Sequence, residues 1–188
     1  MKKQYAIIGN YGVGKSYLLK RIASLGYSVL EADIFFRECY KKNNSCYLEI
    51  QKKMGNEFIN ENEVDREKLR KKITVDNDFK NKLEKIVYPF LEKELSLYKY
   101  DFVEIPNVFS KNANFEQFFT EIFELFNIDE KQIENNVKKK GVNKFISDFN
   151  ANLNQKIFKK NNVKLIDVKN LETNEQLKMF LRKTVNNS

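Results

Sequence analysis

The sequence contains no histidine and no tryptophan, and it has only two cysteines, two prolines and six glycines among its 188 residues. Histidine is the commonest metal ligand and a frequent general base, so any mechanism open to this chain must use other side chains in both roles. The two cysteines, Cys39 and Cys46, cannot build a tetrahedral metal site by themselves. We therefore expect two reduced thiols without a special role.

Long hydrophobic runs are also missing. No stretch of about 18 apolar residues occurs, so we expect no membrane-spanning helix. The N-terminus, MKKQYAIIGN, has only four apolar residues before Gly9, too few for the core of a signal peptide. With 41% hydrophobic and 32% charged residues, the composition is that of an ordinary globular domain. These features predict a cytoplasmic protein without a membrane partner.

The chain does have an excess of positive charge, since 34 Lys and Arg against 26 Asp and Glu give a formal net charge of +8. A basic protein suits an anionic partner, which can be a nucleic acid, a membrane surface or a phosphorylated small molecule. Abundant Lys and Asn can also reflect an AT-rich genome. The basic residues are scattered, and no aromatic and basic RNA-binding motif is visible. We therefore expect a small-molecule partner and no nucleic acid.

One glycine-rich segment, GNYGVGKS at 9–16, fits the pattern G-x-x-x-x-G-K-[ST] in full. The apolar run YAIIG at its start is typical of a buried parallel strand. After the segment, Leu18, Ile22 and Leu25 recur at helical spacing. Gly26 follows and is suited to end the helix. Strand, loop and helix in this order are the context that a phosphate-binding loop requires.

The spacing of this loop explains how it would bind ATP. Glycines let successive backbone N–H groups turn inward, and the helix that begins near Gly14 adds its positive end. Lys15 can bridge the β- and γ-phosphates, and the Ser16 hydroxyl can bind Mg²⁺. We expect Lys15 to be exposed at the mouth of the loop; the alternative is a glycine-rich turn with a solvated lysine. The residues predicted to bind ATP here are Asn10, Tyr11, Gly12, Val13, Gly14, Lys15, Ser16 and Tyr17.

The rest of the chain alternates between predicted strands and predicted helices. Strands are expected at 27–33, 101–106, 121–126 and 163–168. Strands that alternate with helices indicate a parallel sheet with helices on both faces. The predicted fold is therefore an α/β P-loop NTPase with a five-stranded parallel sheet.

The long segment between the second and third strands is predicted to be mostly helical. Asp65 is expected to cap a helix that places Leu69 and Ile73 on one face. A second helical pattern begins near Phe79 and continues until Pro89 bends the chain.

Three more helices are expected later in the chain. One follows 129–141, and the last begins with a capping box formed by Thr173 and Gln176. An intervening helix that packs on the sheet is predicted from the apolar side chains of Phe115, Phe118, Phe119 and Ile122.

Asp33 is predicted to lie at the carboxyl end of the second strand, beside the loop at the carboxyl end of the first. Ligands bind at that edge of an open parallel sheet. A carboxylate there can accept the proton of an attacking hydroxyl, or hold a water molecule of Mg²⁺. The alternative is that Asp33 caps the next helix.

With these residues in place, the chain resembles the dephospho-CoA kinase family, which catalyses the last step of coenzyme A biosynthesis. The family's D-A-D-x-x-x-R segment is present as EADIFFR, which keeps Asp33 and Arg37. Its D-R-x-x-L helix start is present as DREKL, and its L-E-x-I-x-H-P run as LEKIVYP. Its V-D-x-P-L-L-F-E strand is present as VEIPNVFS at 103–110, and its lid segment Q-x-x-R as QIEN at 132–135. The motifs follow the family's order over essentially the whole chain.

The resemblance implies an ATP- and Mg²⁺-dependent kinase that phosphorylates the ribose 3′-hydroxyl of dephospho-CoA. It implies catalytic roles for Lys15 and Asp33 and an ATP contact from Lys139. The implied acceptor-binding residues are Arg37, Arg66, Tyr88 and Pro106. The resemblance also implies a single kinase domain, 1–188, that acts as a monomer or small homo-oligomer. Its core would comprise 1–35, 89–128 and 161–188, with a helical acceptor-binding insertion at 36–88 and a lid at 129–160.

The sequence departs from the family pattern at four positions. Tyr88 replaces a histidine, and Glu104 replaces an aspartate. Asn135 and Lys139 replace two lid arginines. Because arginine binds phosphate through a bidentate fork and lysine acts as a point charge, these lid changes would slow transfer unless neighbouring lysines at 138–144 take over.

A purely structural interpretation stays open for several of these residues. The lid lysines can simply complement the end of a helix, Arg37 and Arg66 can be exposed helix residues, and Tyr88 can be a core tyrosine. The rival functions are a nucleoside monophosphate kinase or another small-metabolite kinase, a degenerate nucleotide-binding protein without turnover, and a basic nucleic-acid-binding module.

Overall fold

The computed structural model describes residues 3–105, 107–127 and 163–186, and it divides the chain into two compact units. The sheet unit comprises Met1–Glu31, Lys99–Val108 and Phe119–Ser188. The helical unit comprises Ala32–Tyr98 and Phe109–Phe118. The helical unit is therefore longer than the insertion predicted at 36–88, and it includes a second segment that follows the third strand.

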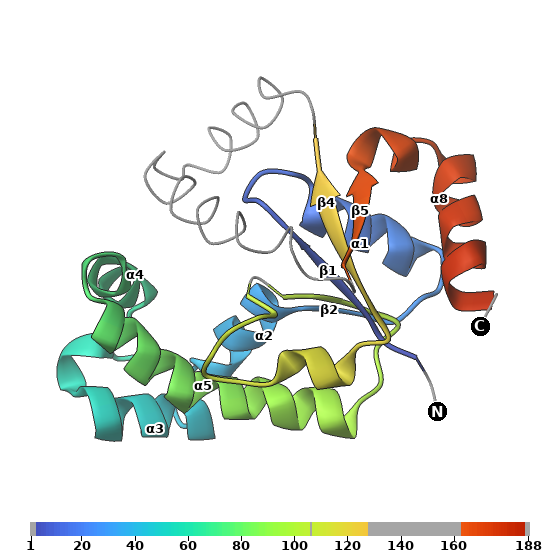
Figure 1. The fold of residues 1–188 in the computed structure, drawn as a ribbon. Helices are drawn as coiled ribbons and strands as arrows, with labels where there is room; N and C mark the ends of the chain where they lie inside the picture. The colour runs from blue at the N-terminus through green and yellow to red at the C-terminus, as the bar shows by residue number, and fades with distance from the viewer. Residues whose placement is uncertain (1–2, 106, 128–162, 187–188) are drawn as a thin grey trace. The chain divides into compact units, whose positions relative to one another are not determined.

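The sheet unit contains a five-stranded parallel sheet in the order β2-β3-β1-β4-β5 (Figure 1). At its centre, Ile7 is in register with Glu104 on one side and with Phe123 on the other. The predicted parallel sheet is confirmed, and two of its strands have the predicted bounds. The strands are β1 (Tyr5–Gly9), β2 (Val29–Glu31), β3 (Phe102–Glu104), β4 (Glu121–Phe126) and β5 (Val163–Asp167).

Two helices, α1 (Lys15–Ser24) and α8 (Asn174–Leu181), pack on one face of this sheet. Alternate residues of a strand share a face, so Tyr5 and Ile7 both point toward these helices. Fully burying one large apolar side chain stabilises a fold by about 1.5–3 kcal/mol. The core of the sheet unit consists of Tyr5, Ile7, Val13, Leu18, Leu19, Ile22, Phe102, Phe123, Leu125, Leu171, Leu177 and Leu181.

The ends of α1 and α8 follow the predicted local signals. Gly26 lies just beyond α1 with a φ of 90°, a left-handed conformation that glycine adopts readily. At the start of α8, the Thr173 hydroxyl accepts a hydrogen bond from the Gln176 backbone N–H at 3.1 Å. The Gln176 side chain accepts one from the Thr173 N–H at 2.9 Å, so the capping box is confirmed.

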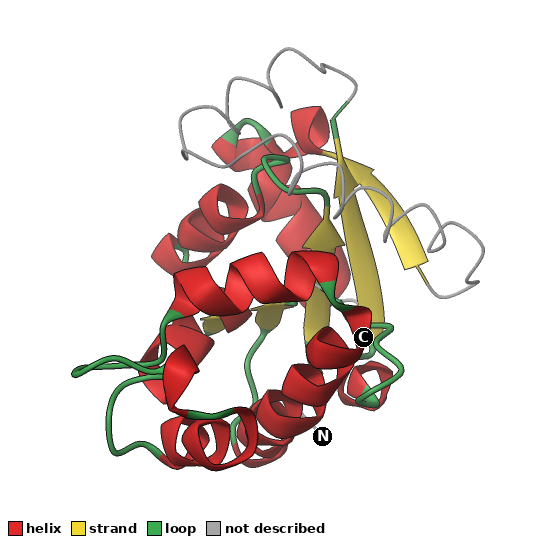
Figure 2. Ribbon diagram, turned by 90° about the vertical axis from the view of Figure 1, so that its left-hand side faces the viewer, coloured by secondary structure: helices red, strands yellow, loops and turns green. Residues whose placement is uncertain are grey.

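The helical unit consists of four α-helices and two short 3₁₀ helices, which are drawn in red in Figure 2. The buried face of the longest helix carries Leu83, Val87, Leu91 and Leu95, each four residues after the last. That helix runs through Pro89 as one element, because the apolar spacing continues on both sides of the proline. The elements are α2 (Ala32–Cys39), α3 (Ser45–Met54), α4 (Arg66–Val75), α5 (Asn77–Leu97) and the 3₁₀ helices Asn56–Phe58 and Phe115–Phe118.

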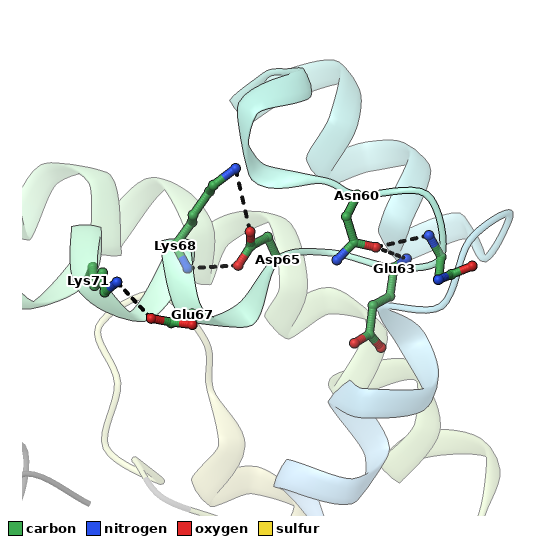
Figure 3. A network of polar contacts seen from close by, with 7 residues as sticks. Asn60, Glu63, Asp65, Glu67, Lys68 and Lys71 are labelled. Carbon is green, nitrogen blue, oxygen red and sulfur yellow. Dashed lines mark hydrogen bonds and ion pairs between the residues drawn. The ribbon is translucent and has the colours of Figure 1, made fainter.

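Side chains fix the point at which α4 begins (Figure 3). Asp65 accepts a hydrogen bond from the Lys68 backbone N–H at 3.0 Å, so the predicted N-cap is confirmed. This N–H bond, with the nearby Lys68 charge, lowers the pKa of Asp65. In the preceding turn, the Asn60 side chain accepts hydrogen bonds from the backbone N–H groups of Asn62 and Glu63, at 2.9 Å each.

Two predicted details are wrong. β2 ends at Glu31, and Asp33 lies in the first turn of α2 instead of at the end of the strand. The helix predicted around Phe115 is a short 3₁₀ helix in the helical unit, and Ile122 belongs to β4. In both places a single apolar stretch continues across the boundary between two elements, so its periodicity does not mark where one ends.

The helix predicted at 129–141 and the lid predicted at 129–160 lie outside the described residues. Within the described part of the chain, no helix has both the length and the apolar character needed to cross a lipid bilayer.

We expect Gly9→Ala to lower the free energy of unfolding by about 2–5 kcal/mol. Gly9 has a φ of 141°, and a Cβ added there would lie 2.5 Å from the carbonyl oxygen of Leu125 in β4. Thermal or urea unfolding monitored by circular dichroism measures the loss.

The matched control is Gly26→Ala. Gly26 also has a positive φ, but an added Cβ would meet no heavy atom within 4 Å among the described residues. It should therefore cost about 1–2 kcal/mol, the strain of the left-handed backbone alone. Equal losses in the two variants would contradict the close approach of β1 and β4.

Candidate active site

The glycine-rich loop connects the end of β1 to the start of α1 in the sheet unit. Gly9 passes against the backbone of β4, and at Gly14, with a φ of 108°, an added Cβ would meet no heavy atom of the described residues within 4 Å. Between them, Val13 is buried in the core, and its backbone N–H donates to the Asn10 carbonyl at 3.3 Å. The loop is thus anchored at its start by Gly9 and further along by the buried side chain of Val13.

The N-terminus of α1 presents a positive helix end beside this loop. The first turn, which lies entirely within the described residues, contains no acidic side chain that would offset the helix dipole. Lys15, Ser16 and Tyr17 contribute their backbone N–H groups to this turn. Such an end, reached through a loop of glycines, fits a bound phosphate group.

Lys15 is not exposed at the mouth of the loop as predicted. Its side chain is 13% exposed, and its ammonium group donates to the carbonyl oxygens of Gly9 at 2.8 Å and Asn10 at 3.1 Å. The Lys15 ammonium group has hydrogen-bond acceptors because the loop turns these two carbonyls toward it. Lys15 therefore also stabilises the loop, which the sequence did not indicate.

Glu104 is an acidic residue close to this ammonium group. It ends β3, is buried, and places one carboxylate oxygen 3.9 Å from the Lys15 nitrogen. The sequence predicted an acid at the end of the third strand, and the structure brings it to the lysine of the loop. A carboxylate at this distance helps to hold the lysine in place without a direct hydrogen bond.

Tyr17, another predicted ATP contact, lies on the surface of α1 and is 68% exposed. The Arg21 guanidinium lies 5.6 Å from the centre of its ring, a cation–π contact. Arg21 also donates to the Leu171 carbonyl and, at 3.3 Å, to the Asn174 side chain. Sequence reasoning gave Arg21 no role, since a single helix arginine carries no local signal.

The helical unit brings together three of the predicted site residues. Asp33 in α2 pairs with Arg37, one helical turn later, at 2.8 Å. Its other oxygen accepts from Arg66, the first residue of α4, at 2.6 Å. Asp33 lies inside the first turn of its helix and contacts these arginines, so the N-cap alternative is wrong.

The Asp33 cluster is largely solvent-exposed. The side chains of Asp33 and Arg37 are 58% and 57% exposed, and exposed ion pairs stabilise a fold by at most about 1 kcal/mol. Two guanidinium groups that share one carboxylate retain a net positive charge. The cluster is therefore suited to meet an anionic ligand through arginine forks.

Tyr88, a predicted acceptor-binding residue, is 9% exposed. Its ring packs against Phe115 and Phe36, with centroids 5.0 and 6.4 Å apart. Burial and the neighbouring Glu84 carboxylate raise the pKa of Tyr88 well above its ordinary value. The core-tyrosine interpretation agrees with this placement.

Two further predicted site residues, Pro106 and Lys139, lie outside the described residues.

For the two cysteines, burial raises the pKa of the Cys39 thiol to about 11 and that of Cys46 to about 12. Both groups are therefore thiols, not reactive thiolates, near neutral pH.

Comparison with known proteins finds a matching family and several dephospho-CoA kinases. A sequence model of the family described as dephospho-CoA kinase matches residues 5–177. The chain is 41% identical over 87 residues to a dephospho-CoA kinase of Mycoplasma genitalium, covering 46% of this chain and 44% of that protein. It is 27% identical over 144 residues to a dephospho-CoA kinase of Mycoplasma pneumoniae, covering 73% and 72% of the two chains. The first of these matches thus spans less than half of the relative's length.

Solved structures share the fold. TT1252 from Thermus thermophilus superposes with a TM-score of 0.72 at 21% identity, covering 99% of this chain and 97% of the other. Dephospho-CoA kinase from Campylobacter jejuni gives a TM-score of 0.59 at 19% identity and covers both chains completely. These likenesses agree with a P-loop NTPase fold. Since the family model matches residues 5–177 of the 188, the chain belongs to the dephospho-CoA kinase family.

Proposed function

We propose that this protein transfers the γ-phosphoryl group of ATP to the ribose 3′-hydroxyl of dephospho-CoA, giving coenzyme A and ADP. The observation that carries the proposal is the phosphate-binding loop, in which Lys15 and the positive end of α1 converge. Family membership supports the choice of acceptor.

At the loop, the backbone N–H groups and the dipole of α1 would bind the phosphates of ATP. Lys15 would exchange the carbonyls of Gly9 and Asn10 for the β- and γ-phosphate oxygens, which are stronger acceptors because they are charged. The Ser16 hydroxyl would hold Mg²⁺, which neutralises phosphate charge when bound.

At the acceptor, Arg37 and Arg66 would bind the pyrophosphate of dephospho-CoA through their guanidinium forks. Asp33 would accept the proton of the 3′-hydroxyl while the hydroxyl oxygen attacks the γ-phosphorus and ADP leaves. The arginines that pair with Asp33 in the structure would also orient it for this role.

Several further features belong to the same proposal. The segment 129–160 would form a lid that excludes water during transfer, with Lys139 facing the phosphates. The protein would act in the cytoplasm as a monomer or small homo-oligomer.

The decisive experiment is a coupled ADP-release assay with dephospho-CoA, AMP, CMP or water as the acceptor. We expect turnover with dephospho-CoA to exceed that with the other three by at least about a hundredfold, because sites built to hydrogen-bond a substrate reject analogues that lack the group by up to about 10⁴–10⁵. Faster turnover with AMP or CMP would make the protein a nucleoside monophosphate kinase. ATP binding without release of ADP would make it a nucleotide-binding protein without turnover.

We expect Lys15→Met to lower kcat by about 10²–10³, because the transition state loses one fixed cation at the γ-phosphoryl group. It should also lower the free energy of unfolding by about 1 kcal/mol, since the hydrogen bonds to Gly9 and Asn10 are lost. Lys20→Met, an exposed lysine of the same helix, is the control and should change neither. Near wild-type kcat in Lys15→Met would show that this loop is not the catalytic ATP site.

We expect Asp33→Asn to lower kcat by about 10²–10⁴ at saturating substrates, because the amide cannot take the hydroxyl proton. The KM for ATP should stay within about twofold, the ordinary reproducibility of such comparisons. Glu38→Gln is the control, as Glu38 is an exposed carboxylate of the same helix that pairs with Lys41 at 2.6 Å. Weaker ATP binding with an unchanged kcat would instead give Asp33 a structural or metal-binding role.

For the lid, we expect Lys139→Ala to lower kcat/KM for dephospho-CoA, and Lys139→Arg to match or exceed the wild type, because guanidinium binds phosphate through two bonds. If Lys139 only complements a helix end, Lys139→Ala costs at most about 1 kcal/mol of stability and leaves the kinetics alone. Steady-state kinetics and thermal unfolding of both variants separate these outcomes.

A further inference from the structure

A buried carboxylate outside the Asp33 cluster organises part of the helical unit. Glu84 lies on α5 and is 8% exposed. One of its oxygens accepts hydrogen bonds from the Ser110 hydroxyl at 3.0 Å and from the Asn112 side-chain amide at 2.7 Å. Lys80, one turn earlier on α5, places its nitrogen 3.9 Å from the other oxygen. The carboxylate therefore has charged and polar partners on both sides.

Stability alone does not call for a carboxylate at this position. Burying an ion costs several kcal/mol of desolvation free energy, which its interactions with partners roughly offset. A protein with a well-packed apolar residue in place of the ion is therefore often equally stable. A network of several donors around one buried acceptor does fix geometry, because each donor must point at the same atom. Glu84 is therefore suited to set the positions of the segments that it joins.

The first of these segments is Phe109–Phe118, the second stretch of chain in the helical unit. Ser110 and Asn112 both belong to it, and the Asn112 backbone N–H also donates to the Ser110 hydroxyl at 3.1 Å. The Asn112 side-chain amide donates in addition to the Asn81 side chain at 3.1 Å. Glu84 thereby attaches this segment to α5.

The second partner is Tyr88, one helical turn after Glu84 on the same helix. Burial and the neighbouring Glu84 carboxylate raise the pKa of Tyr88 well above its ordinary value, so the phenol stays protonated and can donate to that carboxylate. The ring packs against Phe115 of the attached segment and lies near Phe36, with centroids 5.0 and 6.4 Å away. Glu84 thus fixes Tyr88 both through its hydroxyl and through the segment that backs its ring.

Phe36 connects this arrangement to the candidate acceptor site. It lies in α2 between Asp33 and Arg37, and its ring also stacks on Tyr40 at 6.0 Å. α2 is only eight residues long, and its exposed ion pairs hold it weakly. The contact between Tyr88 and Phe36 therefore helps to fix the rotation of α2, and with it the direction of both charged side chains.

We propose that Glu84 and Tyr88 are positioning residues for acceptor binding, which act through Phe36 on the α2 turn that presents Asp33 and Arg37. The inference rests on the proposed function, since it assigns a supporting structure to the same acceptor site. It gives Tyr88 an indirect role in place of direct contact with dephospho-CoA.

The test uses two variants that each remove one hydroxyl and leave the apolar core intact, Tyr88→Phe and Ser110→Ala. Ser110→Ala removes the bond from this hydroxyl to Glu84 and the bond that it accepts from the Asn112 N–H. The loss of each hydrogen bond corresponds to about a two- to tenfold change in an equilibrium constant. We expect the KM for dephospho-CoA to rise by about that factor in each variant, with the KM for ATP within about twofold of the wild type. Tyr47→Phe, which alters a buried tyrosine of α3, controls for the loss of a buried phenol and should leave both KM values unchanged.

A double-mutant cycle with Arg37→Ala tests the route through α2. If Tyr88 acts by directing Arg37, then Tyr88→Phe should change the KM for dephospho-CoA by less than about twofold in the Arg37→Ala background. Additive effects would overturn this route. A KM for dephospho-CoA equal to that of the wild type in both hydroxyl variants, with only a lower Tm, would make the network purely structural. A wild-type protein that transfers nothing to dephospho-CoA would overturn the proposed function, and the positioning role with it.

Discussion

The close approach of β1 and β4 at Gly9 is the constraint on which the sheet unit depends. β1 lies between β3 and β4, and its last residue passes so near the Leu125 carbonyl that only a hydrogen atom fits there. The chain then leaves the sheet through the glycine-rich loop, and Leu18, Leu19 and Ile22 pack α1 back onto the strands. The direction of α1, and hence the position of its positive end, follows from how tightly β1 and β4 pack.

The candidate binding groups are cations whose present partners can be exchanged. Lys15 donates to two neutral carbonyl oxygens, and a carboxylate oxygen of Glu104 lies 3.9 Å away. Arg37 and Arg66 share the single carboxylate of Asp33. In each case the charge is held in position, and a phosphate group would offer charged oxygens to Lys15 and further charged acceptors to the two arginine forks. Such sites are preorganised for an anion without being neutralised in advance.

Two buried carboxylates outside these sites contrast in how they are accommodated. Glu84 accepts hydrogen bonds from two side chains of one segment, Ser110 and Asn112, and has a lysine nearby. Glu124, in the middle of β4, has one oxygen for which no partner occurs in the part of the chain that the structure describes, and burial raises its pKa. A raised pKa in the folded state means that Glu124 favours folding at low pH and that this contribution falls as pH rises. Hydrogen bonds and a nearby lysine stabilise the charged form of Glu84, whereas burial of Glu124 favours its protonated form.

The local elements of this protein were determined by its sequence. The loop pattern, the bounds of β1 and β4, the cap at Asp65 and the capping box at Thr173 all depend on residues within a few positions of one another. Hydrogen bonds of this kind form between near neighbours in the chain, so a short stretch contains all the information needed. The parallel arrangement of the strands followed from the alternation of elements, which restricts the possible topologies.

Only the tertiary structure decided which distant side chains meet. Asp33 and Arg66 are 33 positions apart, and Ser110 and Glu84 are 26 positions apart, so no local pattern relates them. The burial of Lys15 depends on where the carbonyls of its own loop point, which the packing of β1 against β4 sets. Local sequence determines where helices and strands begin and end. The packing of whole elements determines which partner a charged or buried polar group contacts, because such a group is stable only if the fold brings a hydrogen-bonding partner close to it.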